Sequence, residues 1–394
     1  MTDLLVRGGN PWGHPDRTDV LIRDGVIAET GPDLHAPDVT PVDVPGRLVL
    51  PGLVDAHAHL DKTLFGGPWV PHTAGDDLAD RIATERRLRG QLGLPSTGFM
   101  TALLETMIAA GTTHLRTHTD VDPAVGLRRI TAVREIAVLM ADRISVTQVA
   151  FPQYGVLTSP GTAELMEQAL SEGVEAVGGI DPAGLDRDPV RHLDTVFGLA
   201  ERYGTRIDLH LHDGGSLGAW ELELIADRTV ASGLSGRVTV SHAYALGQID
   251  AAHQDRLATR LAAAGVGITT AAVFDFPVPP LKRLLAAGVT VAAGNDCVRD
   301  LWSPYGTGDM LDRAMHLAYR STFRRDEDIE LALRAATYGG ARALGLDRYG
   351  IEVGAPADLV VVAADTPAAA VVLRPVREVV IRSGRVVARN GRLM

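Results

Sequence analysis

Eight short apolar runs alternate with amphipathic stretches between residues 48 and 345, and this alternation limits the possible folds more than any other feature. The pattern is typical of β/α units around a parallel sheet. We expect strands at residues 48–57, 113–120, 145–151, 176–181, 206–212, 238–242, 265–271 and 290–296. Helices are expected between them, for example at 190–203, 218–231 and 249–264. Eight such strands predict an α/β fold with a closed (β/α)8 barrel of the TIM type.

Both ends of the chain have a different sequence pattern, in which short segments of alternating apolar and polar residues are separated by glycines. Residues 4–6 and 20–27, and again residues 357–362 and 379–387, have the pattern of strands. We therefore expect a small β-sandwich domain built from residues 1–48 and 349–394, beside a catalytic barrel domain of residues 49–348. The length of 394 residues suits this division, because a barrel of this type takes about 250 residues.

Composition and charge exclude several classes of function. The formal net charge of -11 leaves no basic stripe for a phosphate backbone, so we expect no nucleic-acid polymer as a partner. Neither a signal-peptide pattern nor an apolar run of about 18 residues occurs, and we expect a cytoplasmic protein that does not bind membranes. The single cysteine, Cys297, excludes intrachain disulfides and multi-cysteine metal sites.

Histidines lie at the carboxyl ends of three expected strands, which is where barrel enzymes place their catalytic groups. The first strand leads into His57 and His59, and residues two apart on an extended chain face the same way. These two side chains can therefore share one metal ion. The fifth strand ends in His210 and His212, and we expect one of the two to be a third ligand.

The sixth and eighth strands add His242 and Asp296 at the same mouth of the barrel. Imidazole and carboxylate ligands suit Zn²⁺, and they also suit Fe²⁺ or Mn²⁺. A site with an open position lowers the pKa of bound water toward neutrality, which yields a hydroxide nucleophile at pH 7. The residues therefore indicate a hydrolytic metal site. The second strand carries His114 and His118, to which we assign structural roles.

Seven longer segments extend this pattern over nearly the whole chain. They are PGLVDAHAHLDK (51–62), HLRTHTDVDP (114–123), VAFPQYG (149–155), DLHLHD (208–213), VSHA (240–243), GNDCVRDLWSPYGTGDM (294–310) and GAPADLVV (354–361). These segments resemble the amidohydrolase superfamily, and within it the cytosine deaminase and N-isopropylammelide hydrolase group. The resemblance implies one divalent metal, for which Zn²⁺ is preferred, held by His57, His59, His210 and Asp296. It also implies that His242 is hydrogen-bonded to the hydroxide and that Asp296 accepts the proton of the water.

The resemblance also implies four contacts with substrate. Gln153 falls where cytosine deaminases hold the amide edge of the ring, and Trp302 falls where an indole packs against it. Asp181 matches a substrate-pocket aspartate, and Lys62 is placed to bind an oxo group of the ring. The alternatives are a loop cap for Gln153, core packing for Trp302, a helix cap for Asp181 and a solvated surface position for Lys62.

Two positions depart from the cytosine deaminase pattern. Asp213 stands where those enzymes have a glutamate proton shuttle, and its shorter side chain could still shuttle if the ring lies nearer or a water intervenes. Cys297 stands where cytosine deaminase has an acidic residue. Together with Lys62, these differences indicate a pocket adapted to an oxo-substituted ring other than cytosine.

We therefore expect a metal-dependent hydrolytic deaminase that removes ammonia or an alkylamine from a small heterocycle such as a pyrimidine or an s-triazine. One alternative is a hydrolase of cyclic amide bonds; such enzymes often hold two metals with a carboxylated lysine on the fourth strand, where residues 178–181 contain no lysine. Another alternative is a non-catalytic scaffold, which would have lost metal ligands. The family likeness further implies a homo-oligomer.

Overall fold

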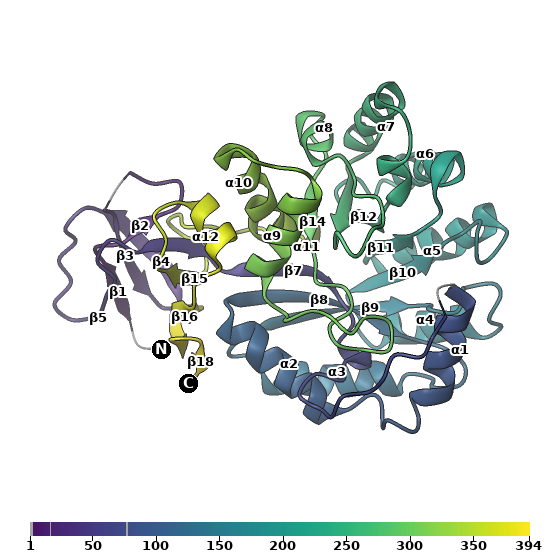
Figure 1. Cartoon of the computed structure of the whole chain (residues 1–394), viewed down its shortest axis with the longest axis horizontal. Helices are drawn as coiled ribbons and strands as arrows, with labels where there is room; N and C mark the ends of the chain where they lie inside the picture. The colour runs from purple at the N-terminus through teal and green to yellow at the C-terminus, as the bar shows by residue number, and fades with distance from the viewer. Residues whose placement is uncertain (1–2, 16, 76–77) are drawn as a thin grey trace.

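Eight parallel strands form the centre of the computed structural model, which describes residues 3–15, 17–75 and 78–394 (Figure 1). Each strand pairs with the next one along the chain. The strands are β7 (Leu53–Ala58), β8 (Thr112–Asp120), β9 (Ser145–Phe151), β10 (Ala176–Ile180), β11 (Arg206–Leu211), β12 (Val238–His242), β13 (Val266–Thr270) and β14 (Val291–Ala293). The predicted TIM-like barrel is confirmed.

The barrel closes between its first and last strands. The amide of Asp296 donates to the carbonyl oxygen of His57 at 2.7 Å, next to an isolated parallel bridge between Ala58 and Asp296. Buried Asp55 supports this seam, because its carboxylate accepts from the backbone amide of Asn295 at 3.0 Å and from its side-chain amide at 2.7 Å. The chain can approach so closely only because residue 294 is glycine: a Cβ there would lie 2.5 Å from the Cβ of His57.

Helices connect the strands and cover the outside of the barrel (Figure 1). They are α1 (Leu78–Leu88), α2 (Thr97–Ala109), α3 (Arg128–Leu139), α4 (Thr162–Ser171), α5 (Pro189–Tyr203), α6 (Gly215–Ala231), α7 (Ala251–Ala264), α8 (Leu281–Ala286), α9 (Met310–Arg320), α10 (Asp326–Arg334) and α11 (Gly340–Leu344), with the short turns η1 (Leu60–Lys62), η2 (Tyr244–Gly247) and η3 (Ala335–Gly339). Local signals set their ends. In α5, for example, Asp188 caps the first turn, Pro189 occupies the first helical position and Gly204 takes a left-handed conformation at the end.

The two ends of the chain form two further sheets that lie to one side of the barrel (Figure 1). One sheet has the order β4-β3-β1-β5, and the other has the order β18-β17-β16-β15-β6-β2. Their strands are β1 (Leu4–Arg7), β2 (Asn10–Pro11), β3 (Asp19–Arg23), β4 (Val26–Gly31), β5 (Thr40–Asp43), β6 (Leu48–Pro51), β15 (Leu359–Val362), β16 (Arg377–Arg382), β17 (Arg385–Arg389) and β18 (Arg392–Leu393), with α12 (Pro367–Leu373) after β15. Apolar residues from both sheets share one core, including Ile22, Val49 and Val361. The predicted β-sandwich built from both termini is therefore confirmed.

The strand expected at residues 48–57 is in fact two strands in two different sheets. β6 pairs with β15 of the sandwich, whereas β7 pairs with β8 of the barrel. The chain passes from one sheet to the other at Gly52, whose amide donates to the carbonyl of Asp358 and where a Cβ would lie 2.3 Å from Thr113 Oγ1. The division into domains at residues 1–48, 49–348 and 349–394 stays a proposal.

No helix within the described ranges has the length and apolar character needed to cross a lipid bilayer.

We predict that Gly294→Ala destabilises the protein by about 1–3 kcal/mol, because the added methyl group collides with the backbone of His57 at the barrel seam. Gly198→Ala is the matched control. Gly198 lies within α5, and a Cβ at this position would meet no atom within 4 Å, so the same change should raise stability by about 0.5–1 kcal/mol. Urea unfolding of both variants measures the difference, and equal stability of the two variants would contradict the proposed close approach.

Candidate active site

Four of the predicted ligand atoms converge at the carboxyl ends of the barrel strands. Asp296 Oδ1 lies 3.5 Å from His57 Nε2 and 3.4 Å from His59 Nε2. His210 Nε2 lies 3.4 Å from His59 Nε2. Around a tetrahedral ion with bonds of about 2.1 Å, neighbouring ligand atoms are about 3.4 Å apart. The observed separations therefore match the edges of such a coordination shell.

The second ring nitrogen of two of these histidines is held by the barrel. His57 Nδ1 lies 2.8 Å from Ser241 Oγ, and that hydroxyl donates to Asp208 Oδ1 at 2.8 Å. His59 Nδ1 lies 3.1 Å from the carbonyl oxygen of His118, to which only an N–H can be bonded. These contacts leave the Nε2 lone pairs free to point toward one another, which is the arrangement that metal-ligating histidines adopt.

The residues present therefore fit a divalent metal ion. His57 Nε2 and His242 Nε2 are buried and have no hydrogen-bond partner among the described residues. Buried polar atoms rarely remain unpaired, and a bound ion would satisfy them. Ligand atoms of His57, His59 and Asp296 lie within 4.8 Å of one another, as do those of His57, His210 and His242. The donor set of imidazoles and one carboxylate suits Zn²⁺, Fe²⁺ or Mn²⁺.

The charges of these groups suit ligation. Burial lowers the pKa of His59 and lowers that of His210 further, so both imidazoles are neutral at pH 7. Burial alone would raise the pKa of Asp296, but the adjacent imidazoles of His57 and His59 outweigh it and hold the pKa of Asp296 well below its usual range. Neutral imidazoles and an ionised carboxylate are the forms that bind a metal.

Strained backbone marks the same strand ends. His242 has φ of 71° and Asp296 has φ of 59°, in the left-handed region that non-glycine residues rarely adopt. Asp181 has φ of 36°. Such conformations cost about 1–3 kcal/mol each and cluster at functional sites, where surrounding structure enforces them.

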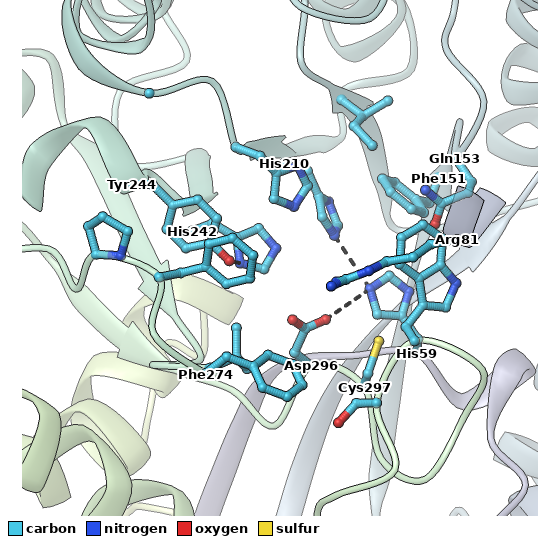
Figure 2. A pocket seen from close by; sticks show the side chains of 18 of the residues that line it. His59, Arg81, Phe151, Gln153, His210, His242, Tyr244, Phe274, Asp296 and Cys297 are labelled. Atoms are coloured by element: carbon cyan, nitrogen blue, oxygen red, sulfur yellow. Dashed lines mark hydrogen bonds and ion pairs between the residues drawn. The ribbon is translucent and has the colours of Figure 1, made fainter. Parts of the chain in front are cut away.

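A pocket with a volume of about 430 Å³ opens directly over these atoms (Figure 2). Figure 2 shows Gln153, Phe151 and Arg81 on one side of it, Tyr244 and Phe274 on the other, and Asp296 between them. The residues that line it are His59, Lys62, Arg81, Phe151, Gln153, Ile180, His210, His212, Gly214, His242, Tyr244, Gln248, Val273, Phe274, Phe276, Pro277, Asp296, Cys297, Trp302 and Ser303. Three of the predicted substrate contacts, Lys62, Gln153 and Trp302, are thus at the pocket.

Lys62 is a buried residue, so the alternative of a solvated surface lysine is wrong. Its ammonium donates to Gln153 Oε1 and lies 3.0 Å from Asp120 Oδ1 and 3.9 Å from Glu85 Oε2. Burial alone would lower the pKa of Lys62, but Asp120 and Glu85 raise it well above its usual range. Lys62 is therefore a permanently charged group whose ammonium already has acidic partners.

Trp302 is tied to the same cluster. Its indole Nε1 donates to Glu85 Oε2 at 2.7 Å, and Lys62 Nζ lies 5.6 Å from the ring centroid. The hydrogen bond holds the orientation of the indole, and Trp302 is one of the residues that line the pocket. Core packing alone does not describe this residue.

Two of the predicted residues are not among those that line the pocket. Asp181 lies behind His212: its carboxylate is 2.8 Å from His212 Nδ1 and accepts from the backbone amide of His212 at 2.6 Å. The His212 ring in turn stacks on His242, with centroids 4.5 Å apart. Asp181 therefore contacts the site through His212, and direct contact with substrate is not the arrangement seen.

Asp213 is turned toward the neighbouring loop. Its Oδ2 accepts from the backbone amide of Gly184 at 2.7 Å, and its carboxyl group shares a hydrogen bond with Glu221. Burial and the nearby Asp181 raise the pKa of Asp213, and burial beside Asp213 raises the pKa of Glu221 to about 8. The structure thus does not bring Asp213 to the pocket, and its role as a proton shuttle stays a prediction.

Sequence reasoning missed several residues of the site. Ser241 and Asp208 orient His57. Ser241 lies in the motif VSHA and Asp208 in DLHLHD, so their positions beside proposed ligands could have indicated this role. Glu85 and Arg81 lie on α1, and nothing in the sequence indicated a role for them, because neither lies within one of the recognised motifs. Of the two histidines given structural roles, His114 lies 3.0 Å from Asp358 of the sandwich. His118 is buried against His57, with ring centroids 4.1 Å apart, and its structural role stays a prediction.

Comparison with known proteins agrees with this geometry. Residues 102–388 match the amidohydrolase family. The N-isopropylammelide isopropyl amidohydrolase of Pseudomonas sp. strain ADP is 32% identical over 393 residues, covering 98% of both chains. The chain belongs to the amidohydrolase family. The predicted family and enzyme class, a hydrolase of carbon–nitrogen bonds other than peptide bonds, are confirmed.

Solved structures of other amidohydrolases have the same fold over the full length. The N-isopropylammelide isopropylaminohydrolase of Burkholderia multivorans is similar with a TM-score of 0.96 and 47% identity, covering 100% of each chain. The 5-methylcytosine deaminase of Klebsiella pneumoniae, crystallised with 5-fluorocytosine, is similar with a TM-score of 0.86 and 26% identity, covering 98% of this amidohydrolase and 97% of that chain.

We predict that Ser241→Ala weakens metal binding roughly ten- to hundred-fold, because His57 loses the partner that fixes its ring. The measurement is competition for Zn²⁺ with a chelator of known affinity. Ser232→Ala, at the far end of α6, removes the same hydroxyl away from the site and should leave affinity unchanged. Equal affinities in the two variants would show that Ser241 does not position the ligand.

A second carboxylate fixes the loop that carries Gln153. Asp186 accepts hydrogen bonds from the backbone amides of residues 156–158 and lies 2.7 Å from His192 Nδ1. Burial alone would raise its pKa, but the hydrogen bonds from His192 and Thr158 lower the pKa of Asp186 to about 2. A carboxyl group with a depressed folded-state pKa stabilises the protein above its unfolded pKa of about 4, and this stabilisation is lost as pH falls through about 2.

We therefore predict that Asp186→Asn lowers the free energy of unfolding by about 1–3 kcal/mol at pH 7. The difference from the wild-type protein should shrink as pH falls from about 4 to about 2. Denaturant unfolding over this pH range is the measurement. Asp188→Asn is the control, because asparagine caps a helix about as well as aspartate and the change should have little effect. A difference that is independent of pH would contradict this account of Asp186.

Proposed function

We propose that this amidohydrolase is a metal-dependent deaminase that removes ammonia or an alkylamine from a small oxo-substituted nitrogen heterocycle, a pyrimidine or an s-triazine. The observation that carries the proposal is the convergence of His57, His59, His210 and Asp296 beneath a pocket of about 430 Å³. The N-isopropylammelide and 5-methylcytosine hydrolases among its relatives act on rings of this kind.

His57, His59, His210 and Asp296 would hold one divalent ion, with Zn²⁺ as our proposal for its identity. Such an ion supplies a hydroxide nucleophile near neutral pH and polarises the carbon that is attacked. Asp296 is ionised and lies at the edge of the pocket, so its carboxylate can accept the proton of the attacking water. His242 faces the same volume with a buried, unpaired Nε2 and can hydrogen-bond to the oxygen that adds to the ring.

The two walls of the pocket suit the two ends of such a substrate. Lys62, Gln153 and Trp302 form a polar wall for an oxo-substituted ring. On the opposite side, Tyr244 and Phe276 stack with centroids 4.9 Å apart, and Phe274 is 45% exposed beside them. An apolar wall of this kind can cover an alkyl group on the leaving amine.

The direct donation of a proton to the leaving nitrogen is assigned to Asp296 and His242. The carboxyl group of Asp213 bonds to the Gly184 amide and to Glu221 away from the lining residues. Its participation would require a water or a movement of the loop after β11. The proposed assembly is a homo-oligomer, as the family likeness implied.

We predict that Asp296→Asn abolishes tight metal binding and lowers turnover by several powers of ten, whereas the fold is retained. The measurements are metal content after gel filtration, circular dichroism, and release of ammonia or isopropylamine from aminotriazines and aminopyrimidines. Asp227→Asn is a control of the same type, since its exposed carboxylate pairs with Arg260 and lies outside the ligand set and the pocket. Opening of the ring without release of amine would favour a cyclic amide hydrolase instead. Full turnover by Asp296→Asn would reject the mechanism.

A further inference from the structure

Arg81 reaches into the pocket as a cation for which the described residues provide no partner. It lies on α1 and is one of the residues that line the pocket, where Figure 2 shows its side chain extending inward beside Phe151 and Gln153. Within residues 3–15, 17–75 and 78–394, no carboxylate forms an ion pair with it. A guanidinium has five N–H donors and no acceptor, so half-buried Arg81 can bind a ligand that offers hydrogen-bond acceptors.

The other cation of the pocket is already neutralised. Lys62 belongs to a buried cluster in which two cations, Lys62 and Arg129, face three carboxylates. Arg129 lies 2.7 Å from Asp61, 3.0 Å from Asp120 and 3.4 Å from Glu85, and Lys62 lies 3.0 Å from Asp120. The cluster therefore has no excess positive charge to offer a ligand.

The polar wall nevertheless presents only donors. Gln153 Oε1 accepts from the Lys62 ammonium, so the free group of the carboxamide is its NH₂. Trp302 Nε1 already donates to Glu85, so it is not available to a ligand. Neither Arg81 nor Lys62 has an acceptor. A neutral ring edge that contains an N–H donor would meet a wall without a free acceptor.

We propose that the substrate ring binds as an anion and that Arg81 pairs with its ionised O–C–N edge. This proposal rests on the proposed function. Dioxo rings of the cyclic imide type lose a ring N–H proton and spread the charge over the nitrogen and the two flanking oxygens, which leaves an edge that only accepts hydrogen bonds. The planar guanidinium fits such an edge with two parallel bonds, and the NH₂ of Gln153 adds a third. Arg81 is thus a specificity-determining residue that selects the ionised form of the ring.

The test is calorimetric binding of cyanuric acid, a cyclic imide that ionises near neutral pH, to the zinc-loaded protein below and above the pKa of the ring. We expect affinity of the wild-type protein to rise with pH as the anion forms. In Arg81→Gln, affinity for the anion should fall about ten- to hundred-fold and the rise with pH should be lost. Arg81→Lys should restore part of the affinity, because the charge returns without the bidentate geometry.

Arg87→Gln is the matched control. Arg87 lies on the same helix, is exposed and does not line the pocket, so its removal changes net charge equally and should leave binding unchanged. The other charged or titratable groups facing the ligand remain in every variant. Their titration therefore affects the dependence of affinity on pH in the same way in the wild-type protein and in each variant. They are His59, Lys62, His210, His212, His242, Tyr244, Asp296 and Cys297.

The possible results distinguish a failure of the role proposed for Arg81 from a failure of the proposed deaminase function. Equal affinity and equal pH dependence in wild type and Arg81→Gln would overturn the role of Arg81, even if amine release is observed. Weaker binding in Arg81→Gln and Arg87→Gln alike would also overturn it, since only net charge would matter. Charge-dependent binding of cyanuric acid through Arg81, with no amine released from the aminotriazines and aminopyrimidines tested above, would support this inference and reject the deaminase function.

Discussion

The hydrogen bond from the Asp296 amide to the His57 carbonyl joins the last strand of the barrel to the first. It sets the stagger of the closed sheet, and the stagger decides which strand ends meet at the mouth. Because the two bonded residues are themselves proposed metal ligands, closure of the fold and assembly of the site are one event. Gly294 makes this contact possible, since any larger residue would push the seam apart.

Around this seam, the side chains of the site are each held by further residues. The ligand rings are held by Ser241 and by a backbone carbonyl, and the hydroxyl of Ser241 is held by buried Asp208. On the substrate side, Lys62 and Trp302 are held by Glu85 of α1. Burying so many charges is costly unless each is paired, and the strained backbone at His242 and Asp296 adds to that cost. The apolar barrel below supplies the compensating stability.

Much of the fold could be predicted because it depends on local periodicity. The strand expected at residues 145–151 and the one at 238–242 have the observed bounds, and the helix at 190–203 begins one residue earlier. The passage at Gly52 could not be predicted, because both strands that meet there are apolar and only their partners differ. Convergence of the metal ligands followed from their places at strand ends. Asp213 was harder to place, since the direction of a side chain after a strand depends on the turn and not on the strand.

The sandwich sheet has a consequence for biosynthesis. β6 at residues 48–51 pairs with β15 at residues 359–362. The ribosome therefore synthesises β6 more than three hundred residues before its partner strand. During translation its unpaired edge and the apolar side chains around Val49 stay uncovered while the barrel emerges from the ribosome. Such an edge is a template for pairing with other chains. Chaperone dependence during synthesis, and misassembly between nascent copies on one messenger RNA, are therefore expected to centre on β6 rather than on the barrel.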